Sequence, residues 1–161
     1  MLNKTTVSAI RALVLLAQQG TGACWSPRKL AETMGESPTY MAKIVHHMVR
    51  AGILEAARGV KGGVSLAKKP ADITLQAIVE ACQGPVVGDY CRTEARTPAL
   101  CSFHLASLEL HDAIIGVLER WTLAGLLKKP YGQGKHDGLG CLMSRGMQVQ
   151  APVQIRIGGV L

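Results

Sequence analysis

The sequence predicts a mainly helical fold that carries one small β-hairpin. Apolar residues recur at helical spacing in five segments, which are 7–18, 27–34, 38–51, 75–82 and 102–127. Glycines follow each of the first three segments, as is typical of helix ends. Two short stretches, 53–57 and 64–67, have the character of strands and flank a glycine-rich turn. The first 70 residues thus contain three helices and a hairpin, and two further helices follow.

The composition is that of a folded chain outside the membrane. Of its 161 residues, 48% are apolar and 18% are charged, so the chain can bury a core. No apolar run approaches the length of about 18 residues that a membrane-spanning helix needs. The start lacks the apolar region and cleavage site of a secretory signal, and five cysteines are an odd number for disulfide pairing. We therefore expect a cytoplasmic protein without membrane spans.

The first three helices have recognisable boundaries. Thr5 or Thr6 would cap the first helix, which has one apolar face. Ser26-Pro27 and Ser37-Pro38 each supply an N-cap residue followed by proline at the first helical position. Gly35 separates these two helices by a tight turn. Two short helices joined in this way predict a helix-turn-helix, whose second helix enters the DNA major groove.

The hairpin after the third helix has the features of a wing. Its turn reads Arg-Gly-Val-Lys-Gly-Gly over residues 58–63. The glycines allow the backbone to approach a phosphate or a narrow minor groove, and Arg58 and Lys61 supply positive charge. We interpret residues 1–70 as a winged helix-turn-helix DNA-binding domain.

The positive charge of the chain is concentrated in this domain. The net charge is +7, and residues 1–70 hold ten basic and three acidic residues, whereas residues 71–161 hold eight of each. An excess on one side is typical of a polyanion-binding module joined to a neutral one. A basic face that only keeps the protein soluble is the alternative.

Candidate DNA contacts follow from these positions. The first turn of the third helix offers three polar side chains to base edges or phosphates, and a lysine follows one turn later. Arg28 and Lys29 lie near the start of the preceding helix, where they could contact phosphate, although Lys29 could equally be a solvated surface residue. The predicted DNA-binding set is Arg28, Ser37, Thr39, Tyr40, Lys43, Arg58 and Lys61.

The segment from Met34-Gly35 to Gly52-Ile53-Leu54, with the wing turn, resembles the Rrf family of bacterial winged-helix regulators, which includes IscR, NsrR and CymR. The similarity covers about residues 1–130 and is most specific in the Arg-Gly-x-x-Gly-Gly turn and the junction 51–54. The resemblance implies a homodimeric transcription factor. Many members of that family hold an iron–sulfur cluster or sense their signal through cysteine thiols.

Residues 71–130 are the predicted sensor and dimerisation region. Thr74 can cap a helix that runs to about Cys82, and a long helix from Ser102, its expected N-cap, runs to about Leu127. The rest of the chain is too short to cover the apolar side of the long helix, so we expect it to pair with a second copy. Dimeric regulators of this kind contact paired half-sites. The apolar stripe comprises Leu105, Leu108, Ile115, Leu118 and Trp121, widened by Ile114 and Val117.

Three soft or borderline metal ligands lie at one end of the long helix. They are Cys91, Cys101 and His104, and the start of a helix favours a thiolate at Cys101. In the resemblance, Cys91 matches the first loop cysteine of the cluster-binding members, Cys101 the last, and His104 a histidine ligand that some members use. The third loop cysteine of the family has no counterpart in residues 92–100, and Cys82 is the nearest substitute.

The ligand set leaves several sensing modes open. An iron–sulfur cluster, [2Fe–2S] in preference to [4Fe–4S], would use Cys91, Cys101 and His104, with Cys82 as the fourth candidate. If Cys82 is a buried apolar residue instead, solvent, Asp89 or Glu94, or a side chain of the partner subunit would complete the site. Thiol redox sensing without metal, a zinc site and a loop that has lost its ligand are the alternatives.

We therefore expect a homodimeric, sequence-specific transcriptional repressor whose DNA affinity follows the state of its cluster or cysteines. A metal-free winged-helix regulator and a protein-interaction module are the alternatives. The chain has no Walker phosphate loop, dinucleotide-binding fingerprint or nucleophile elbow, so we do not expect an enzyme. Residues 131–161 form a glycine-rich extension to which the sequence assigns no role.

Overall fold

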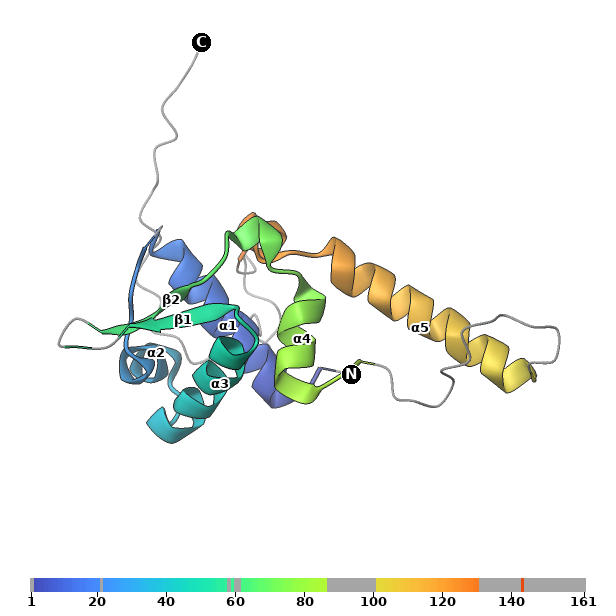
Figure 1. The fold of residues 1–161 in the computed structure, drawn as a ribbon, viewed down its shortest axis with the longest axis horizontal. Coiled ribbons are helices and arrows are strands. Elements are labelled where there is room, and N and C mark those ends of the chain that lie inside the picture. Colours follow the sequence, from blue (N-terminus) through green and yellow to red (C-terminus); the bar gives the residue numbers. More distant parts are fainter. Residues whose placement is uncertain are drawn as a thin grey trace, which may run out of the picture.

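The structure is a computed structural model that describes residues 2–20, 22–57, 59, 62–86, 101–130 and 143. A body of helices and one hairpin is the main unit, and a long helix projects from it (Figure 1). The mainly helical fold with a two-stranded antiparallel wing is confirmed. The elements are α1 (Lys4–Gln18), α2 (Pro27–Met34), α3 (Pro38–Arg50), β1 (Leu54–Ala57), β2 (Gly63–Leu66), the 3₁₀ turn η1 (Pro70–Asp72), α4 (Leu75–Gln83), α5 (Ser102–Arg120) and α6 (Leu123–Leu127).

Helix α1 is the centre of the body. All residues from 8 to 16 are buried, because α3, α4, α6 and β2 pack around this helix. The prediction of a single apolar face was therefore too narrow. The N-cap is Asn3, whose side chain accepts a hydrogen bond from the Thr6 backbone N at 2.8 Å, and not Thr5 or Thr6 as predicted. The hydroxyl of Thr6 is buried and donates to Gln83 of α4 at 3.0 Å.

Helices α2 and α3 form the predicted helix-turn-helix. The hydroxyls of Ser26 and Ser37 accept hydrogen bonds from backbone N–H groups of the first turns, and a proline follows each of them. Gly35 ends α2 with a φ of +65°, a conformation that favours glycine. The sequence thus predicted these helix boundaries correctly. The buried side chains of the two helices are Leu30, Ala31, Met34, Met41, Ile44, Val45 and Met48.

The hairpin is held against the segment that precedes α2. Strands β1 and β2 are antiparallel, with Leu54 opposite Leu66. Trp25 adds a bridge to β2, in which its N donates to Val64 O at 3.0 Å and its O accepts from Val64 N at 2.8 Å. A Cβ atom on Gly63 would lie 2.7 Å from the carbonyl of Trp25. Glycine is therefore required at this position of the hairpin.

The long C-terminal helix ends earlier than predicted. Helix α5 stops at Arg120, and α6 is a separate helix capped by Thr122. Two backbone hydrogen bonds cause the break, because Leu75 N donates to Trp121 O at 2.7 Å and the N of the first α6 residue donates to Ile73 O at 2.8 Å. These bonds hold Trp121 in an extended conformation between the two helices.

Helices α4 and α5 begin at or next to the cap residues that the sequence predicted. Thr74 caps α4 as predicted, and α4 contacts α1 and α3. Cys101 is the N-cap residue of α5 and Ser102 its first helical residue, so the cap lies one position earlier than predicted. The Cys101 side chain makes no capping hydrogen bond.

None of the described helices is long and apolar enough to cross a membrane.

Candidate DNA interface and cysteine region

One side of α3 is exposed and carries basic residues. Thr39, Lys43, His46 and Arg50 are exposed, and their spacing of four, three and four places them along one side of the helix. The opposite side is buried in the core. Hydroxyl and ammonium groups on such a face can reach base edges in a major groove. His46 and Arg50 were outside the predicted set, although their helical spacing from Lys43 could have indicated them.

Ser37 and Tyr40 hold the start of α3 in place. The Ser37 hydroxyl accepts from Tyr40 N at 3.2 Å, so it caps the helix. Tyr40 is half-buried, its hydroxyl donates to Thr5 Oγ1 at 3.4 Å, and Lys4 Nζ lies 5.4 Å from the centre of its ring. Ser37 therefore caps α3 and Tyr40 connects α3 to α1, in addition to the DNA contacts predicted for them. Thr39 is the exposed polar side chain of the first turn.

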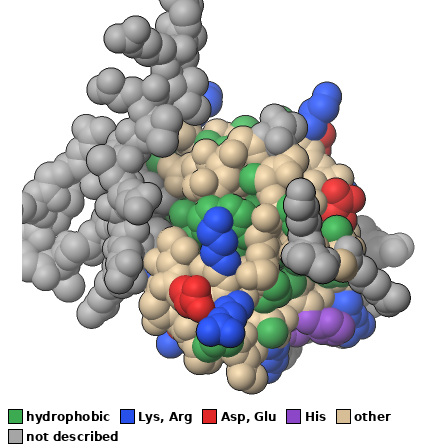
Figure 2. Space-filling view, turned by 90° about the vertical axis from the view of Figure 1, so that its left-hand side faces the viewer, with side chains coloured by type: hydrophobic (Ala, Val, Ile, Leu, Met, Phe, Trp, Pro, Cys, Tyr) green, Lys and Arg blue, Asp and Glu red, His purple; other side chains and the backbone are tan. Residues whose placement is uncertain are grey.

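The start of α2 presents two adjacent cations in different surroundings. Arg28 Nε lies 2.9 Å from Glu32 Oε1, and both side chains are exposed. Lys29 Nζ lies 3.9 Å from the centre of the Trp25 ring. Figure 2 shows the face on the hairpin side of the molecule, where Lys and Arg side chains occur in several places. Cations so distributed can contact phosphates on both sides of a groove.

The two wing cations, Arg58 and Lys61, lie outside the described residues. The strands that flank them, β1 and β2, pair as the sequence predicted. The role of the two cations in DNA binding stays a prediction from the sequence.

Glu36, in the turn between α2 and α3, is held by three side chains of α1. Ser8 Oγ donates to it at 3.1 Å, Arg11 Nη1 lies 3.9 Å away and Lys4 Nζ 3.8 Å away. The side chains of Arg11 and Glu36 are only 8% and 14% exposed, whereas that of Lys4 is 78% exposed. The Arg11 Nε also donates to the carbonyl of Met143 at 3.3 Å. This cluster fixes the helix-turn-helix relative to the central helix.

Replacing Glu36 by alanine is expected to lower the free energy of unfolding by about 2 kcal/mol, because the nearly buried Arg11 loses an anionic partner. Lys4→Gln removes the exposed partner of the same carboxylate and should cost less than about 0.5 kcal/mol. Urea unfolding followed by circular dichroism measures both. Equal midpoints for the two variants would contradict a stabilising role for the Glu36–Arg11 pair.

Cys101 and His104 lie at the projecting start of α5. Cys101 is exposed at the N-cap. Among the described residues, His104 Nε2 is the buried side-chain polar atom without a hydrogen-bond partner. Buried polar atoms normally have a partner, and an imidazole nitrogen is a common metal ligand. The thiol and the imidazole therefore fit the donor types that an iron–sulfur cluster requires. Cys91 lies outside the described residues.

Cys82 lies in a different environment. It is half-buried in α4, and burial raises the pKa of its thiol, an effect that a hydrogen bond with the Thr6 side chain partly opposes. A raised pKa disfavours the thiolate that a metal ligand must supply. The described part of the chain contains no group of three or more His, Cys, Asp or Glu side chains that could hold a metal ion. The structure thus does not bring Cys82 to Cys101 and His104, and its role as a ligand stays a prediction.

An exposed apolar stripe runs along α5. Phe103, Leu110 and Val117 are 77%, 62% and 44% exposed, and their spacing of seven places them on one side of the helix. Trp121, which directly follows the helix, is 45% exposed. We call these four residues the α5 stripe. Leu118 is the one buried residue of the helix. The apolar pattern predicted from the sequence included Val117 and Trp121 of this stripe but missed Phe103 and Leu110, because most of its residues lie on the other side of α5.

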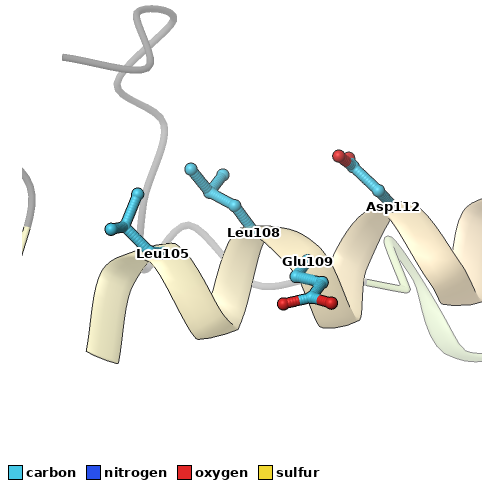
Figure 3. A pocket seen from close by; sticks show the side chains of 4 residues that line it. All are labelled: Leu105, Leu108, Glu109 and Asp112. Atoms are coloured by element: carbon cyan, nitrogen blue, oxygen red, sulfur yellow. The ribbon is translucent and has the colours of Figure 1, made fainter. Parts of the chain in front are cut away.

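That other side carries a shallow pocket. Its lining residues are Leu105, Leu108, Glu109 and Asp112. The two leucines and Asp112 point to the same side of the helix, whereas Glu109 points away from them (Figure 3). Helix α5 therefore has apolar residues on two sides. A helix of this kind needs apolar contacts on both sides to be stable in water.

Comparison with known proteins identifies the family. The family model that matches is Rrf2, described as an iron-dependent transcriptional regulator, over residues 2–129. The chain belongs to the Rrf2 family. It is thus a DNA-binding transcriptional regulator and not an enzyme, as the sequence predicted. The resemblance noted from the helix-turn-helix and the wing turn is confirmed.

Two curated relatives are bacterial regulators. The chain is 29% identical over 131 residues to the HTH-type transcriptional regulator NsrR of Geobacillus kaustophilus, a match that covers 79% of this chain and 89% of that protein. It is 34% identical over 76 residues to YwgB of Bacillus subtilis, a putative HTH-type transcriptional regulator. This second match spans 47% of the chain and 49% of the relative.

Solved structures share the Rrf2 fold. CymR of Bacillus subtilis, described as a global cysteine regulator, matches with a TM-score of 0.66 at 23% identity, over 80% of this chain and 96% of its own. IscR of T. potens matches with a TM-score of 0.63 at 24% identity, over 86% and 93%. The winged helix-turn-helix fold predicted from the sequence is therefore confirmed.

Proposed function

We propose that this Rrf2 protein is a homodimeric repressor that binds paired half-sites in double-stranded DNA in the cytoplasm. Its DNA affinity is set by an iron–sulfur cluster or by the redox state of its cysteines. The observation that carries the sensor role is the buried, partnerless Nε2 atom of His104, which lies one helical turn from the exposed Cys101. The family description as iron-dependent regulators supports the cluster.

Helix α3 reads the DNA in this proposal. Thr39 and Lys43 lie on its exposed side and contact base edges, with Ser37 and Tyr40 at its start. Arg28 in α2 and the predicted wing cations Arg58 and Lys61 contact phosphates. These last contacts position the domain on the duplex without reading its sequence.

The α5 stripe joins two copies of the chain. It is an exposed apolar surface of the projecting helix, and its four large side chains are 44–77% exposed in a single chain. Exposed apolar residues aligned on one side of a helix mark a surface that another protein covers. A symmetric pair would present two α3 helices to two half-sites one helical turn of DNA apart.

Cys101 and His104, with Cys91, are the ligands that we propose for the cluster. Cys82 or a side chain of the partner subunit would complete the set. An iron–sulfur cluster supplies a centre whose charge and integrity respond to redox state and to iron supply. Histidine is an established ligand of [2Fe–2S] centres, which favours that type over [4Fe–4S]. Ligation at the start of α5 would order this end of the dimer helix and bias the spacing of the two DNA-binding domains.

Thiol chemistry without a metal is the second candidate. Cys101 is exposed at the N-cap of α5, and its side chain makes no capping hydrogen bond. An exposed cysteine side chain is open to reversible oxidation.

Protein purified without oxygen is expected to show broad absorption bands between about 320 and 460 nm, together with bound iron and sulfide. Cys101→Ser and His104→Ala should abolish or shift these bands. Cys24→Ser changes an exposed cysteine of the DNA-binding domain and should keep them. Colourless, iron-free protein with intact DNA binding would contradict the cluster. Loss of DNA affinity on mild oxidation, absent in Cys101→Ser, would then identify thiol sensing.

A further inference from the structure

The residue that precedes the α2 cap links three parts of the DNA-binding domain. The Trp25 backbone pairs with Val64 in β2 through two hydrogen bonds, of 3.0 and 2.8 Å. The carbonyl of Trp25 approaches so closely to Gly63 that only glycine fits there. Its ring packs against the hydrophobic core. Trp25 therefore has a fixed position between the hairpin and the start of α2.

Both the backbone and the ammonium group of Lys29 contact the segment of Trp25 and Ser26. Its backbone N donates to the Ser26 hydroxyl at 3.1 Å, which fixes it in the first turn of α2. Its ammonium group lies 3.9 Å from the centre of the Trp25 ring, a close cation–π contact. Among the described residues, no ion pair joins Lys29 to an acidic side chain. Its neighbour Arg28 differs, since it pairs with Glu32 at 2.9 Å.

We propose that Trp25 is a positioning residue that holds Lys29 as a DNA phosphate contact between α2 and the wing. In a helix-turn-helix protein the first helix of the motif crosses the DNA backbone while the second lies in the major groove. The start of α2 and strand β2 meet at Trp25. An ammonium group fixed there lies where phosphate oxygens pass. This inference rests on the DNA-binding function of the chain and adds a contact to it.

The ring matters because a lysine side chain has many rotamers. Ordering a free lysine on a phosphate costs conformational entropy at the moment of binding. The Trp25 ring holds the ammonium in place before DNA arrives. A cation–π contact at an exposed site contributes about 0.5–1 kcal/mol, which corresponds to a factor of about 2–5 in affinity. The charge of Lys29 itself contributes through counterion release from the duplex.

The test uses the full-length protein and a fluorescein-labelled duplex of arbitrary sequence, because phosphate contacts do not depend on sequence. Fluorescence anisotropy gives the affinity over a series of salt concentrations. Lys29→Gln should bind about 5–10-fold more weakly near 0.1 M salt. The slope of log affinity against log salt should become shallower by about 0.9 for each phosphate that the variant leaves unneutralised. Lys128→Gln removes an exposed lysine at the end of α6 and should leave both quantities unchanged.

Trp25 is tested through its coupling to Lys29. Trp25→Leu should weaken binding about 2–5-fold, and Trp25→Phe, which keeps an aromatic face, should retain most of the affinity. In the Lys29→Gln background, Trp25→Leu should have no further effect, because the group that the ring holds is gone. A purely structural role for Trp25 would weaken binding equally in both backgrounds.

Three outcomes would overturn the inference. They are a salt slope of Lys29→Gln equal to that of the wild type, an equal effect of Trp25→Leu with and without Lys29, and a Trp25→Phe variant no better than Trp25→Leu. A wild-type affinity that does not change with salt would contradict the DNA interface as a whole instead. Thermal unfolding of each variant identifies any weakening of binding that comes from unfolding of the domain.

Discussion

Leu110→Glu is expected to convert the proposed dimer into a monomer and to weaken binding to a duplex with two half-sites by about 10²–10⁴-fold. Leu110 is 62% exposed in the single chain and lies in the middle of the α5 stripe, between Phe103 and Val117. A carboxylate at this place would be buried in an apolar contact without a partner, which is strongly unfavourable. Once the copies separate, each half-site is bound singly and the gain from bivalent binding disappears.

Sedimentation equilibrium measures the first effect, and anisotropy with a duplex selected from a random-sequence library measures the second. Glu119→Ala is the control, because Glu119 is exposed and lies on the side of α5 opposite the stripe. It should leave both mass and affinity unchanged. A Leu110→Glu protein that stays dimeric would show that another surface joins the two copies.

Removing the two wing cations together, Arg58→Ala with Lys61→Ala, is expected to weaken binding about 10²-fold for every duplex at low salt. Each subunit would neutralise two phosphates fewer, and each neutralised phosphate adds about 0.9 to the salt slope. Thr39→Val should act differently, since Thr39 is exposed in the first turn of α3 and reads bases in the proposed complex. It should change the preference between selected and arbitrary duplexes by about 5–150-fold, which corresponds to about 1–3 kcal/mol of discrimination at one position.

The matched control for the wing is Lys128→Gln with Lys129→Gln, which removes two exposed charges at the end of α6. Competition between a selected and an arbitrary duplex separates the two kinds of effect. A uniform decrease in affinity from both the wing variant and Thr39→Val would show that the division between phosphate contacts and base contacts is wrong.

Local signals in the sequence were sufficient for the helix-turn-helix. Ser26 and Ser37 cap their helices, and Gly35 ends α2 in a left-handed conformation. These features depend on residues within one turn of each other, so the sequence contains all the information needed. The hairpin was predictable for the same reason, and so was the family, because its most specific motif lies in the wing turn.

Contacts between distant segments decided what local patterns missed. The end of α5 at Arg120 follows from backbone hydrogen bonds of residues 121 and 123 with residues 75 and 73. The apolar pattern continues through this break, so periodicity alone indicated one helix. In the same way, the buried surroundings of α1 depend on four other elements. Asn3 caps α1 in place of Thr6, and the Thr6 hydroxyl is instead buried and hydrogen-bonded to Gln83.

For the candidate site as well, some features follow from the sequence alone and others only from the tertiary structure. By itself the sequence determined the family and the basic character of its domain, and it predicted the recognition helix and Cys101 and His104 as candidate sensor residues. Only the tertiary structure decided that the Lys29 ammonium group lies over the Trp25 ring, that Phe103 and Leu110 lie in the exposed α5 stripe, and that Cys82 is half-buried beside α1. Side-chain exposure and contacts between distant segments depend on how all the elements pack, whereas caps and turns depend on neighbours in the chain.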